Sequence, residues 1–192
     1  LQAAEEEQRE QTKKRNKLLY QSEHDELTGL YNKRSLNRYL EDVFEACKLN
    51  EKELGILFLD IDYFKQLNDR YGHGKGDEGI CAVADTLKKI FPEDYVARYG
   101  GDEFLVVMTG RDLTYAMEHA ESLCAGIREY KIPNEDSELE PWLTISVGGV
   151  CAIPREPNRV WDFLSAADNT LYEQKKEQKG KVRFYQGEGK YL

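Results

Sequence analysis

The sequence predicts an α+β fold in which helices flank a central, mostly antiparallel sheet. Three patterns support this prediction. The run Leu54–Ile61 is short and almost wholly apolar, as in a buried central strand. Two apolar segments enclose a glycine pair and an acid pair at residues 100–103, which is typical of a β-hairpin. Elsewhere, apolar residues recur at three- and four-residue spacing, which indicates amphipathic helices.

Residues 1–22 differ in composition from the rest of the chain. They are highly charged and contain neither glycine nor proline, and an acidic run at residues 5–7 precedes a basic run at residues 13–15. Acids near the N-terminal end and bases near the C-terminal end match the helix dipole, so we expect an exposed helix. It is either a solvated leader or the end of a signalling helix that connects to an upstream sensor domain. Residues 23–192 then form the main domain.

The remaining elements follow in order. Gly29 breaks the leader helix, and helical spacing resumes at residue 33. We expect helices at 33–49, 63–70, 77–90, 113–130 and 160–178, and strands at 54–61, 95–99, 103–109, 143–153 and 182–185. From the first strand onward this gives the order β-α-α-β-β-α-β-α-β, which is close to a ferredoxin-like core.

The bulk composition limits the classes of function. The chain has 192 residues, enough for one domain, and its net charge of −9 argues against a nucleic-acid-binding surface. A nucleotide substrate remains compatible with this charge, because a metal ion can supply local positive charge. No signal peptide or apolar stretch of membrane length is present, so we expect no membrane contact by this segment.

Two acidic clusters predict a metal site. Asp60 lies at the carboxyl end of the first strand, and Asp102 lies in the hairpin turn. If these strands are neighbours, the two carboxylates and the Ile61 carbonyl can bind Mg²⁺, which takes its other ligands from phosphates and water. Such a site serves phosphoryl or nucleotidyl transfer. An isolated Gly-Gly-Asp is more often a solvated turn, and the second cluster is what favours the metal site.

The segment between the clusters is suited to a nucleotide. A helix that opens at Tyr63 and Phe64 presents free N–H groups to phosphates, with Lys65 one step further along. Guanine offers hydrogen-bond donors, which an acceptor such as Asp77 and an amide such as Asn68 can recognise. Taken singly, such residues are more often helix caps or turn residues.

Together these residues resemble a known family, the GGDEF diguanylate cyclases. The resemblance covers about residues 25–185 and follows the family's order and spacing. Its motifs are Asp25-x-Leu27-Thr28-Gly29-Leu30-x-Asn32, Asp60-x-Asp62-x-Phe64-Lys65-x-x-Asn68-Asp69, Gly72-His73-x-x-Gly76-Asp77, Gly100-Gly101-Asp102-Glu103-Phe104, Leu143-Thr144-Ile145-Ser146-Val147-Gly148 and Ala167-Asp168-x-x-Leu171-Tyr172-x-x-Lys175.

The resemblance implies a nucleotidyl-cyclase, palm-type version of this core. It also implies condensation of two GTP molecules into cyclic di-GMP, with release of pyrophosphate, across a homodimer in the cytoplasm. The domain would then be the output of a larger signalling protein, which could itself be a membrane-anchored receptor. Two Mg²⁺ ions per site are implied, with Mn²⁺ as an alternative.

The resemblance also implies roles for individual residues. Asp60, the Ile61 carbonyl and Asp102 would bind metal, and Asp102, Glu103 and Lys65 would act in catalysis. The residues implied to bind GTP are Phe64, Asn68, His73, Asp77, Lys175 and Lys179.

Two departures from the family pattern stand out. Gln178-Lys179-Gly180 replaces the usual Gly-Arg-Asn, so Lys179 keeps the charge without the bidentate geometry of arginine. The product-inhibition motif Arg-x-x-Asp reads Phe91-Pro92-Glu93-Asp94, in which only Asp94 remains. We therefore expect weak or absent feedback through this site, unless Arg98 or another basic residue substitutes.

Other functions compete with the cyclase interpretation. One alternative is a catalytically silent GTP-binding regulatory domain, which the loss of Asp60, Lys65 or Asp102 would have favoured. Another is a dimerisation module driven by the leader helix, which requires no metal site. A cyclase that also accepts ATP is a minor alternative, and Asp77 as an acceptor facing guanine argues against it.

Overall fold

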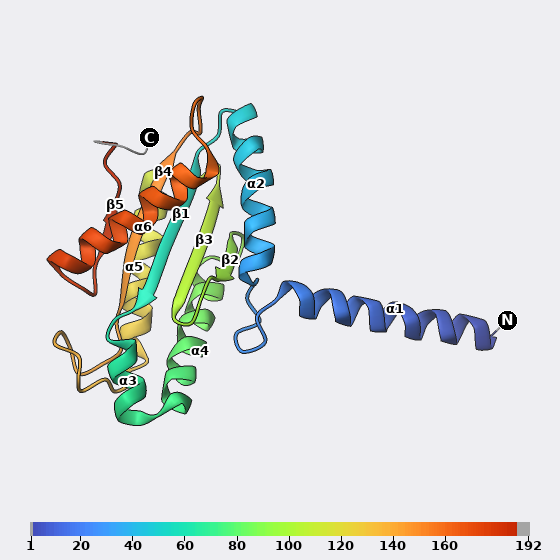
Figure 1. The fold of residues 1–192 in the computed structure, drawn as a ribbon, viewed down its shortest axis with the longest axis horizontal. Coiled ribbons are helices and arrows are strands. Elements are labelled where there is room, and N and C mark those ends of the chain that lie inside the picture. Colours follow the sequence, from blue (N-terminus) through green and yellow to red (C-terminus); the bar gives the residue numbers. More distant parts are fainter. Residues whose placement is uncertain (1, 188–192) are drawn as a thin grey trace.

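The computed structural model describes residues 2–187 and confirms the predicted α+β architecture (Figure 1). Every expected helix and strand is present, in the expected order. The elements are α1 Gln2–Glu23, α2 Lys33–Leu49, β1 Leu54–Ile61, α3 Phe64–Tyr71, α4 His73–Ile90, β2 Tyr95–Arg98, β3 Glu103–Thr109, α5 Leu113–Glu129, β4 Ile145–Ala152, α6 Val160–Glu177 and β5 Val182–Phe184.

The five strands form one mixed sheet in the order β2-β3-β1-β4-β5. β1 lies in the centre and pairs antiparallel with both β3 and β4, and only β4 and β5 run parallel. The register places Asp60 opposite Glu103 on one side and opposite Ser146 on the other. Asp60 of the first predicted acidic cluster and Glu103 of the second therefore lie side by side at one end of the strands.

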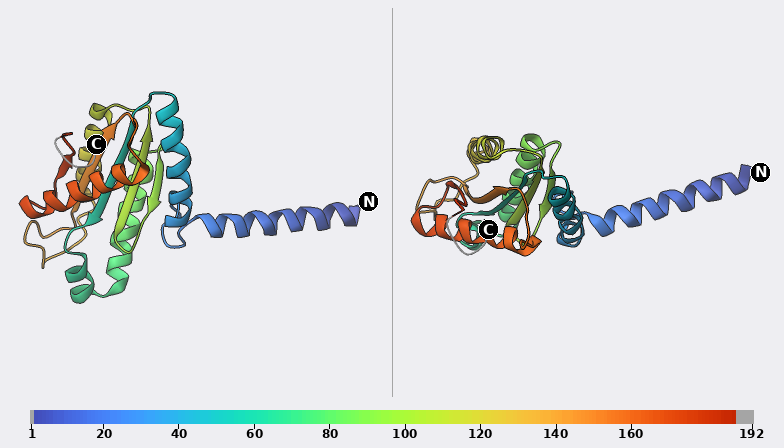
Figure 2. Two further views of the ribbon diagram at one scale, coloured as in Figure 1. Left: turned by 45° about the horizontal axis from the view of Figure 1, so that its top comes forward. Right: turned by 90° about the horizontal axis from the view of Figure 1, so that it is seen from above.

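Alternating residues of β1 supply the two halves of the core. Leu57, Leu59 and Ile61 pack with α4 and α5, whereas Ile56 and Phe58 pack with α2 and α6 on the opposite face. Figure 2 shows the sheet between these two helical layers. Asp60 shares its parity with Ile56 and Phe58, so its side chain lies on the face that α6 covers.

α6 crosses β4 in direct backbone contact. A Cβ atom at Gly148 would overlap Leu171 N and Ala167 O, so a larger residue there would push the helix off the sheet. This close approach brings the polar side of α6, including Lys175, over the end of β1.

α4 begins four residues earlier than expected, at His73 instead of residue 77. Three glycines in residues 72–76 favour a loop in a sequence-based prediction. In the structure only Gly72, with φ of +86°, makes the turn between α3 and α4, and Gly74 and Gly76 are helical. Gly76 is required for packing, because a Cβ atom there would overlap the Asn68 side chain.

The helix α1 projects away from the domain in all three views (Figures 1 and 2). A stack of aromatic rings anchors its last turn. Tyr20 stacks on His24, His24 on Tyr31, Tyr31 on Tyr95 of β2, and Tyr95 on Tyr39 of α2, with ring centroids 3.9–4.5 Å apart. Within residues 2–187, no helix has the length and apolar character of a membrane span.

Candidate active site

Asp60 is the central acid of the site. Its Oδ2 accepts a hydrogen bond of 2.6 Å from Lys175 Nζ of α6. Its Oδ1 is buried and has no hydrogen-bond partner within the described residues. Burial raises the pKa of Asp60 to about 6, and the charges of Asp62 and Asp102 act in the same direction, against the lowering effect of Lys175. An orphaned carboxylate oxygen with a raised pKa is suited to receive a cation.

The neighbouring acid Asp62 has a different environment. It is 1% exposed, and its two oxygens accept hydrogen bonds from Thr144 Oγ1 at 2.8 Å and Ser146 Oγ at 2.6 Å. Ser146 Oγ in turn accepts from the Gly180 N–H. Asp62 therefore ties β1 to β4 and to the segment after α6, and its oxygens are already satisfied.

The hairpin tip carries Asp102 and Glu103. The Asp102 carbonyl accepts a hydrogen bond from the Ile61 N–H at 3.3 Å, which joins the hairpin to the end of β1. Burial raises the pKa of both carboxyls, and for Glu103 the charges of Asp102 and Asp168 add to this effect. Gly100 leaves room for the Glu103 carboxylate, because a Cβ atom there would lie 2.7 Å from Glu103 Oε2.

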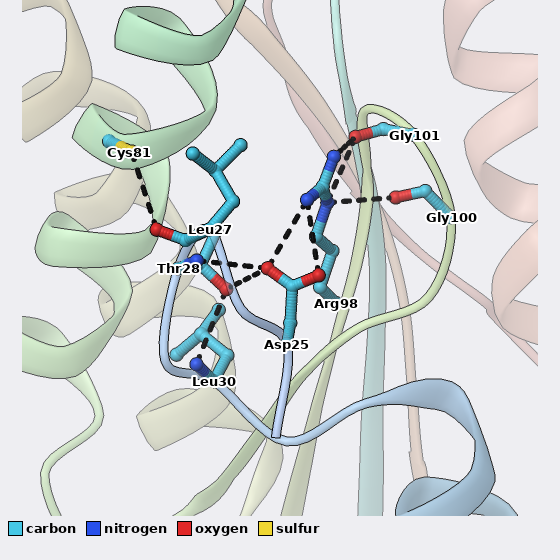
Figure 3. Close-up of polar contacts among 8 residues, drawn as sticks. All are labelled: Asp25, Leu27, Thr28, Leu30, Cys81, Arg98, Gly100 and Gly101. Carbon is cyan, nitrogen blue, oxygen red and sulfur yellow. Dashed lines mark hydrogen bonds and ion pairs between the residues drawn. The ribbon is translucent and has the colours of Figure 1, made fainter. Parts of the chain in front are cut away.

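Arg98 holds this hairpin in place, and sequence reasoning assigned it no such role. Its guanidinium donates to the Gly100 carbonyl and, at 2.7 Å, to the Gly101 carbonyl, and it forms an ion pair of 3.2 Å with Asp25 (Figure 3). Asp25 also accepts hydrogen bonds from the Thr28 N–H and hydroxyl. Burial alone would raise the pKa of Asp25, but the hydrogen bonds from Thr28 and Arg98 hold it below its ordinary value. No spacing rule could pair two residues 73 positions apart.

Two cavities lie beside the ends of β1 and β3. The larger, of 490 Å³, contains most of the predicted nucleotide-binding residues and is called the nucleotide cavity here. The smaller, of 330 Å³, lies on the α6 side and is called the α6 cavity. Lys175 and Lys179 line both. The predicted residues that line the nucleotide cavity are Ile61, Phe64, Lys65, Asn68, His73, Asp102, Lys175 and Lys179.

The end of the nucleotide cavity that is predicted to hold phosphates lies at the start of α3. Tyr63 precedes this helix in a left-handed conformation, with φ of +53°, and no side chain caps the helix. Its first N–H groups are therefore available to an anion. The Lys179 ammonium lies over the Tyr63 ring, 5.5 Å from its centroid, and adds positive charge at this end.

The base end is less complete. Asn68 Oδ1 is buried without a hydrogen-bond partner in the described residues, so it offers an acceptor to a base. Asp77, the other predicted base-reading residue, is exposed on α4 and does not line the cavity. The structure thus brings Asn68, but not Asp77, to the cavity wall.

The residues present suit a divalent cation only with help from a substrate. In residues 2–187, no three His, Cys, Asp or Glu side chains are grouped closely enough to hold a metal by themselves. Magnesium sites in nucleotide enzymes use one or two carboxylates and complete the shell with phosphates and water. Asp60, whose Oδ1 has no hydrogen-bond partner in the described part of the chain, fits this description together with the Ile61 carbonyl and Asp102.

The position expected for the product-inhibition site is occupied by packed side chains. Phe91 is 1% exposed and lies against His119, with ring centroids 5.7 Å apart. Asp94 Oδ2 accepts a hydrogen bond of 2.8 Å from the Tyr115 hydroxyl. The Tyr115 ring in turn stacks on His119 and lies under the Arg111 guanidinium. Arg98, the suggested substitute, is engaged by Asp25 and the hairpin.

Comparison with known proteins identifies the family. Residues 22–181 match the family model described as "Diguanylate cyclase, GGDEF domain". The chain belongs to the GGDEF diguanylate cyclase family. Among curated GGDEF relatives, it is 32% identical over 164 residues to the probable diguanylate cyclase DgcC and 33% identical over 175 residues to the diguanylate cyclase DgcM, both of Escherichia coli K12. These alignments cover 84% and 90% of this chain but only 43% and 41% of the relatives.

Solved GGDEF structures share the fold. The coiled coil and GGDEF domain of DgcB from Caulobacter crescentus, in complex with c-di-GMP, matches with a TM-score of 0.84 at 21% identity, covering 94% of this chain and 95% of that one. Diguanylate cyclase SiaD from Pseudomonas aeruginosa, in complex with its activator SiaC, matches with a TM-score of 0.74 at 28% identity, covering 95% and 70%.

Proposed function

We propose that this chain is a catalytically active diguanylate cyclase domain, the output part of a larger cytoplasmic signalling protein. In this proposal two copies face one another, each holding one GTP, and together they form cyclic di-GMP and two pyrophosphates. The observation that carries the proposal is the buried Asp60 Oδ1, which has no hydrogen-bond partner within residues 2–187 and lies beside Lys175 at the wall of the α6 cavity. A silent domain has no need to keep so costly a group.

The proposed reaction joins two GTP molecules in two equivalent steps. The 3′-oxygen of one GTP attacks the α-phosphorus of the other. A new phosphorus–oxygen bond forms as the bond to the bridging oxygen of the β-phosphate breaks, and pyrophosphate leaves. A second such step closes the ring. Asp60, the Ile61 carbonyl and Asp102 would hold Mg²⁺ or Mn²⁺, which neutralises charge on the phosphates when bound.

The chain's own residues complete the site. The start of α3, with Lys65, Lys175 and Lys179, binds the triphosphate, and Asn68 contacts guanine. His73 lines the same cavity. Asp77 lies on α4 outside the cavity lining, so its side chain would have to move to contact the base. Glu103 accepts the proton of the attacking hydroxyl, because its raised pKa makes it a better base than an ordinary glutamate.

The test is an incubation of the purified 192-residue chain with GTP and Mg²⁺ over a range of protein concentrations. We expect cyclic di-GMP by chromatography, with a specific rate that rises with concentration because two copies are required. Asp102→Ala should abolish product, and the exposed Asp85→Asn on α4 should not. GTP binding without product at any concentration would replace this proposal with the silent regulatory domain.

A further inference from the structure

Lys179 stands where the family pattern has an arginine, and its position in the site needs support from its neighbours. A lysine carries a compact charge on a flexible four-carbon stem, whereas arginine has a rigid fork. In the structure the Lys179 ammonium lies over the Tyr63 ring, 5.5 Å from its centroid, and both residues line the nucleotide cavity. The ring supports the end of the side chain, and the turn after α6 determines where that side chain starts.

This turn is held at Gly180, the residue that follows Lys179. The Gly180 N–H donates to Ser146 Oγ at 3.0 Å, and the Gly180 carbonyl accepts a hydrogen bond of 2.8 Å from Arg128 Nη2. Gly180 has φ of +73°, and a Cβ atom there would lie 3.1 Å from Arg128 Nη2 and 3.2 Å from Leu139 Cδ1. Both backbone polar groups of Gly180 are therefore engaged, and the turn packs directly against the Arg128 guanidinium.

Arg128, in the last turn of α5, is fixed in turn by the acidic loop, residues 134–140, which lies between α5 and β4. Its Nε donates to Glu140 Oε1 at 2.8 Å, and the two side chains are 29% and 38% exposed. A guanidinium can hold a carboxylate and a carbonyl at the same time, because its N–H groups point in fixed directions. Arg128 lines neither the nucleotide cavity nor the α6 cavity. It can therefore act on a bound nucleotide through its neighbours or through its charge, but not by contact.

The acidic loop also contacts the other element that is predicted to bind phosphates. Arg70 of α3 forms ion pairs with Glu135 at 2.5 Å and with Asp136 at 2.9 Å. The side chains of these pairs are more exposed than those of the Arg128 pair, so solvent weakens them more. The loop thus joins α3 to the turn after α6, and Arg128 is its better-shielded anchor.

We propose that Arg128 is a positioning residue for the triphosphate of GTP. By joining Glu140 to the Gly180 carbonyl, it fixes the turn after α6 so that the Lys179 ammonium stays at the end of the nucleotide cavity predicted to hold phosphates. A triphosphate then meets a charge that is already in place, and less side-chain entropy is lost on binding. This inference rests on the proposed function, because it requires the nucleotide cavity to bind GTP.

The experiment is a double-mutant cycle on GTP binding, with Arg128→Gln, Lys179→Ala and their combination. Calorimetry with Ca²⁺ in place of Mg²⁺ measures binding separately from turnover. Arg128→Lys keeps the charge but not the fork. Arg111→Gln is the matched control, because Arg111 lies just before α5, forms an ion pair with Glu93 and lines neither cavity. Circular dichroism reports whether each variant is folded, and Glu140→Gln takes the place of Arg128→Gln in the cycle if the latter does not fold.

We expect Lys179→Ala to raise the dissociation constant for GTP about 10-fold and Arg128→Gln to raise it about 3- to 10-fold, as for loss or weakening of one hydrogen bond to a charged group. Arg128→Lys should resemble Arg128→Gln, and Arg111→Gln should resemble the unchanged chain. In the Lys179→Ala background, Arg128→Gln should add less than about twofold, because the two residues act on the same phosphates.

An equal effect of Arg128→Gln with and without Lys179 would overturn the inference, because Arg128 would then act through the fold in general. GTP binding by Arg128→Lys as tight as that of the unchanged chain would also overturn it, since the charge alone would then suffice. The expected coupling in a chain that forms no cyclic di-GMP would support the inference and overturn the cyclase proposal alone. An unchanged chain that binds no GTP would overturn both.

Discussion

Replacement of Asp60 by asparagine should abolish turnover and yet stabilise the fold in the absence of metal. Asp60 is largely buried, which raises its pKa in the folded state to about 6 from the ordinary value of 3.8. A carboxyl with a raised pKa holds its proton more tightly in the folded state. The free energy of unfolding therefore falls as the pH rises from about 4 to about 7. Asparagine carries no charge at any pH, so the free energy of unfolding of the variant does not fall in this way.

The magnitude follows from the size of the shift. A difference of roughly 2 pKa units, at 1.36 kcal/mol per unit, corresponds to about 3 kcal/mol at pH 8. The pKa of about 6 already includes the lowering effect of Lys175, so the loss of this ion pair in Asp60→Asn is part of the figure, whereas imperfect packing of the amide offsets some of the gain. We expect a net increase of about 1–3 kcal/mol, or a melting temperature higher by about 3–10 °C for a domain of this size.

The assay is thermal unfolding in EDTA at pH 4 and pH 8, with the exposed Asp42→Asn as control. The gain of Asp60→Asn should be present at pH 8 and disappear at pH 4, where the carboxyl is protonated. Addition of Mg²⁺ with a non-hydrolysable GTP analogue should then stabilise the unchanged chain more than the variant, because ligands stabilise the state that binds them. A variant that melts at or below the unchanged chain at pH 8 would refute this account of Asp60.

Three further outcomes are expected. Arg98→Ala should lower the free energy of unfolding by about 2–4 kcal/mol and reduce turnover, because a half-buried ion pair and the hairpin's carbonyl contacts are lost. Denaturant titration measures the stability, and initial rates measure the turnover. Full activity in Arg98→Lys would contradict a role for the forked geometry of the guanidinium. The free energy of unfolding of the unchanged chain should decrease as the pH falls below about 4, since the pKa of Asp25 is lowered in the folded state. Denaturant titration of Arg98→Ala over the same pH range should show a smaller decrease. Cyclic di-GMP should not bind near Asp94, because Phe91 is buried and Asp94 already accepts from Tyr115; tight binding in calorimetry that is lost in Asp94→Ala would contradict this.

The order of helices and strands was predictable from the sequence because it depends on local periodicity. The apolar run of β1 and the three- to four-residue spacing of α2 both record burial directly. The start of α4 was not predictable, because glycine locally disfavours a helix, whereas the structure has a helical Gly76 packed closely against Asn68. Tertiary contact decided this boundary against local propensity.

The candidate site was predictable in part for the same reason. Motif spacing and family resemblance pointed to Asp60, Asp102 and the nucleotide cavity, and the register of β1 with β3 brings these acids to one edge. The partners Asp25 and Arg98 come from distant segments, and nothing local in either one records their pairing. The absence of the inhibitory arginine was visible in the sequence. The sequence did not show that the residue in its place, Phe91, is buried against the His119 ring.

The pair Asp60 and Asp62 shows why sequence alone assigns such acids poorly. The two are separated by one residue, and burial raises the pKa of both. The hydroxyl groups of Thr144, just before β4, and of Ser146 in β4 satisfy both oxygens of Asp62, so its burial strengthens the link between the end of β1 and β4. Within residues 2–187, only Lys175 hydrogen-bonds to the Asp60 carboxylate, and one oxygen is left without a partner beside the α6 cavity. The difference between the two acids therefore comes from their partners and not from the motif. Asp62 supports the fold, whereas the burial of Asp60 is unfavourable until a ligand binds.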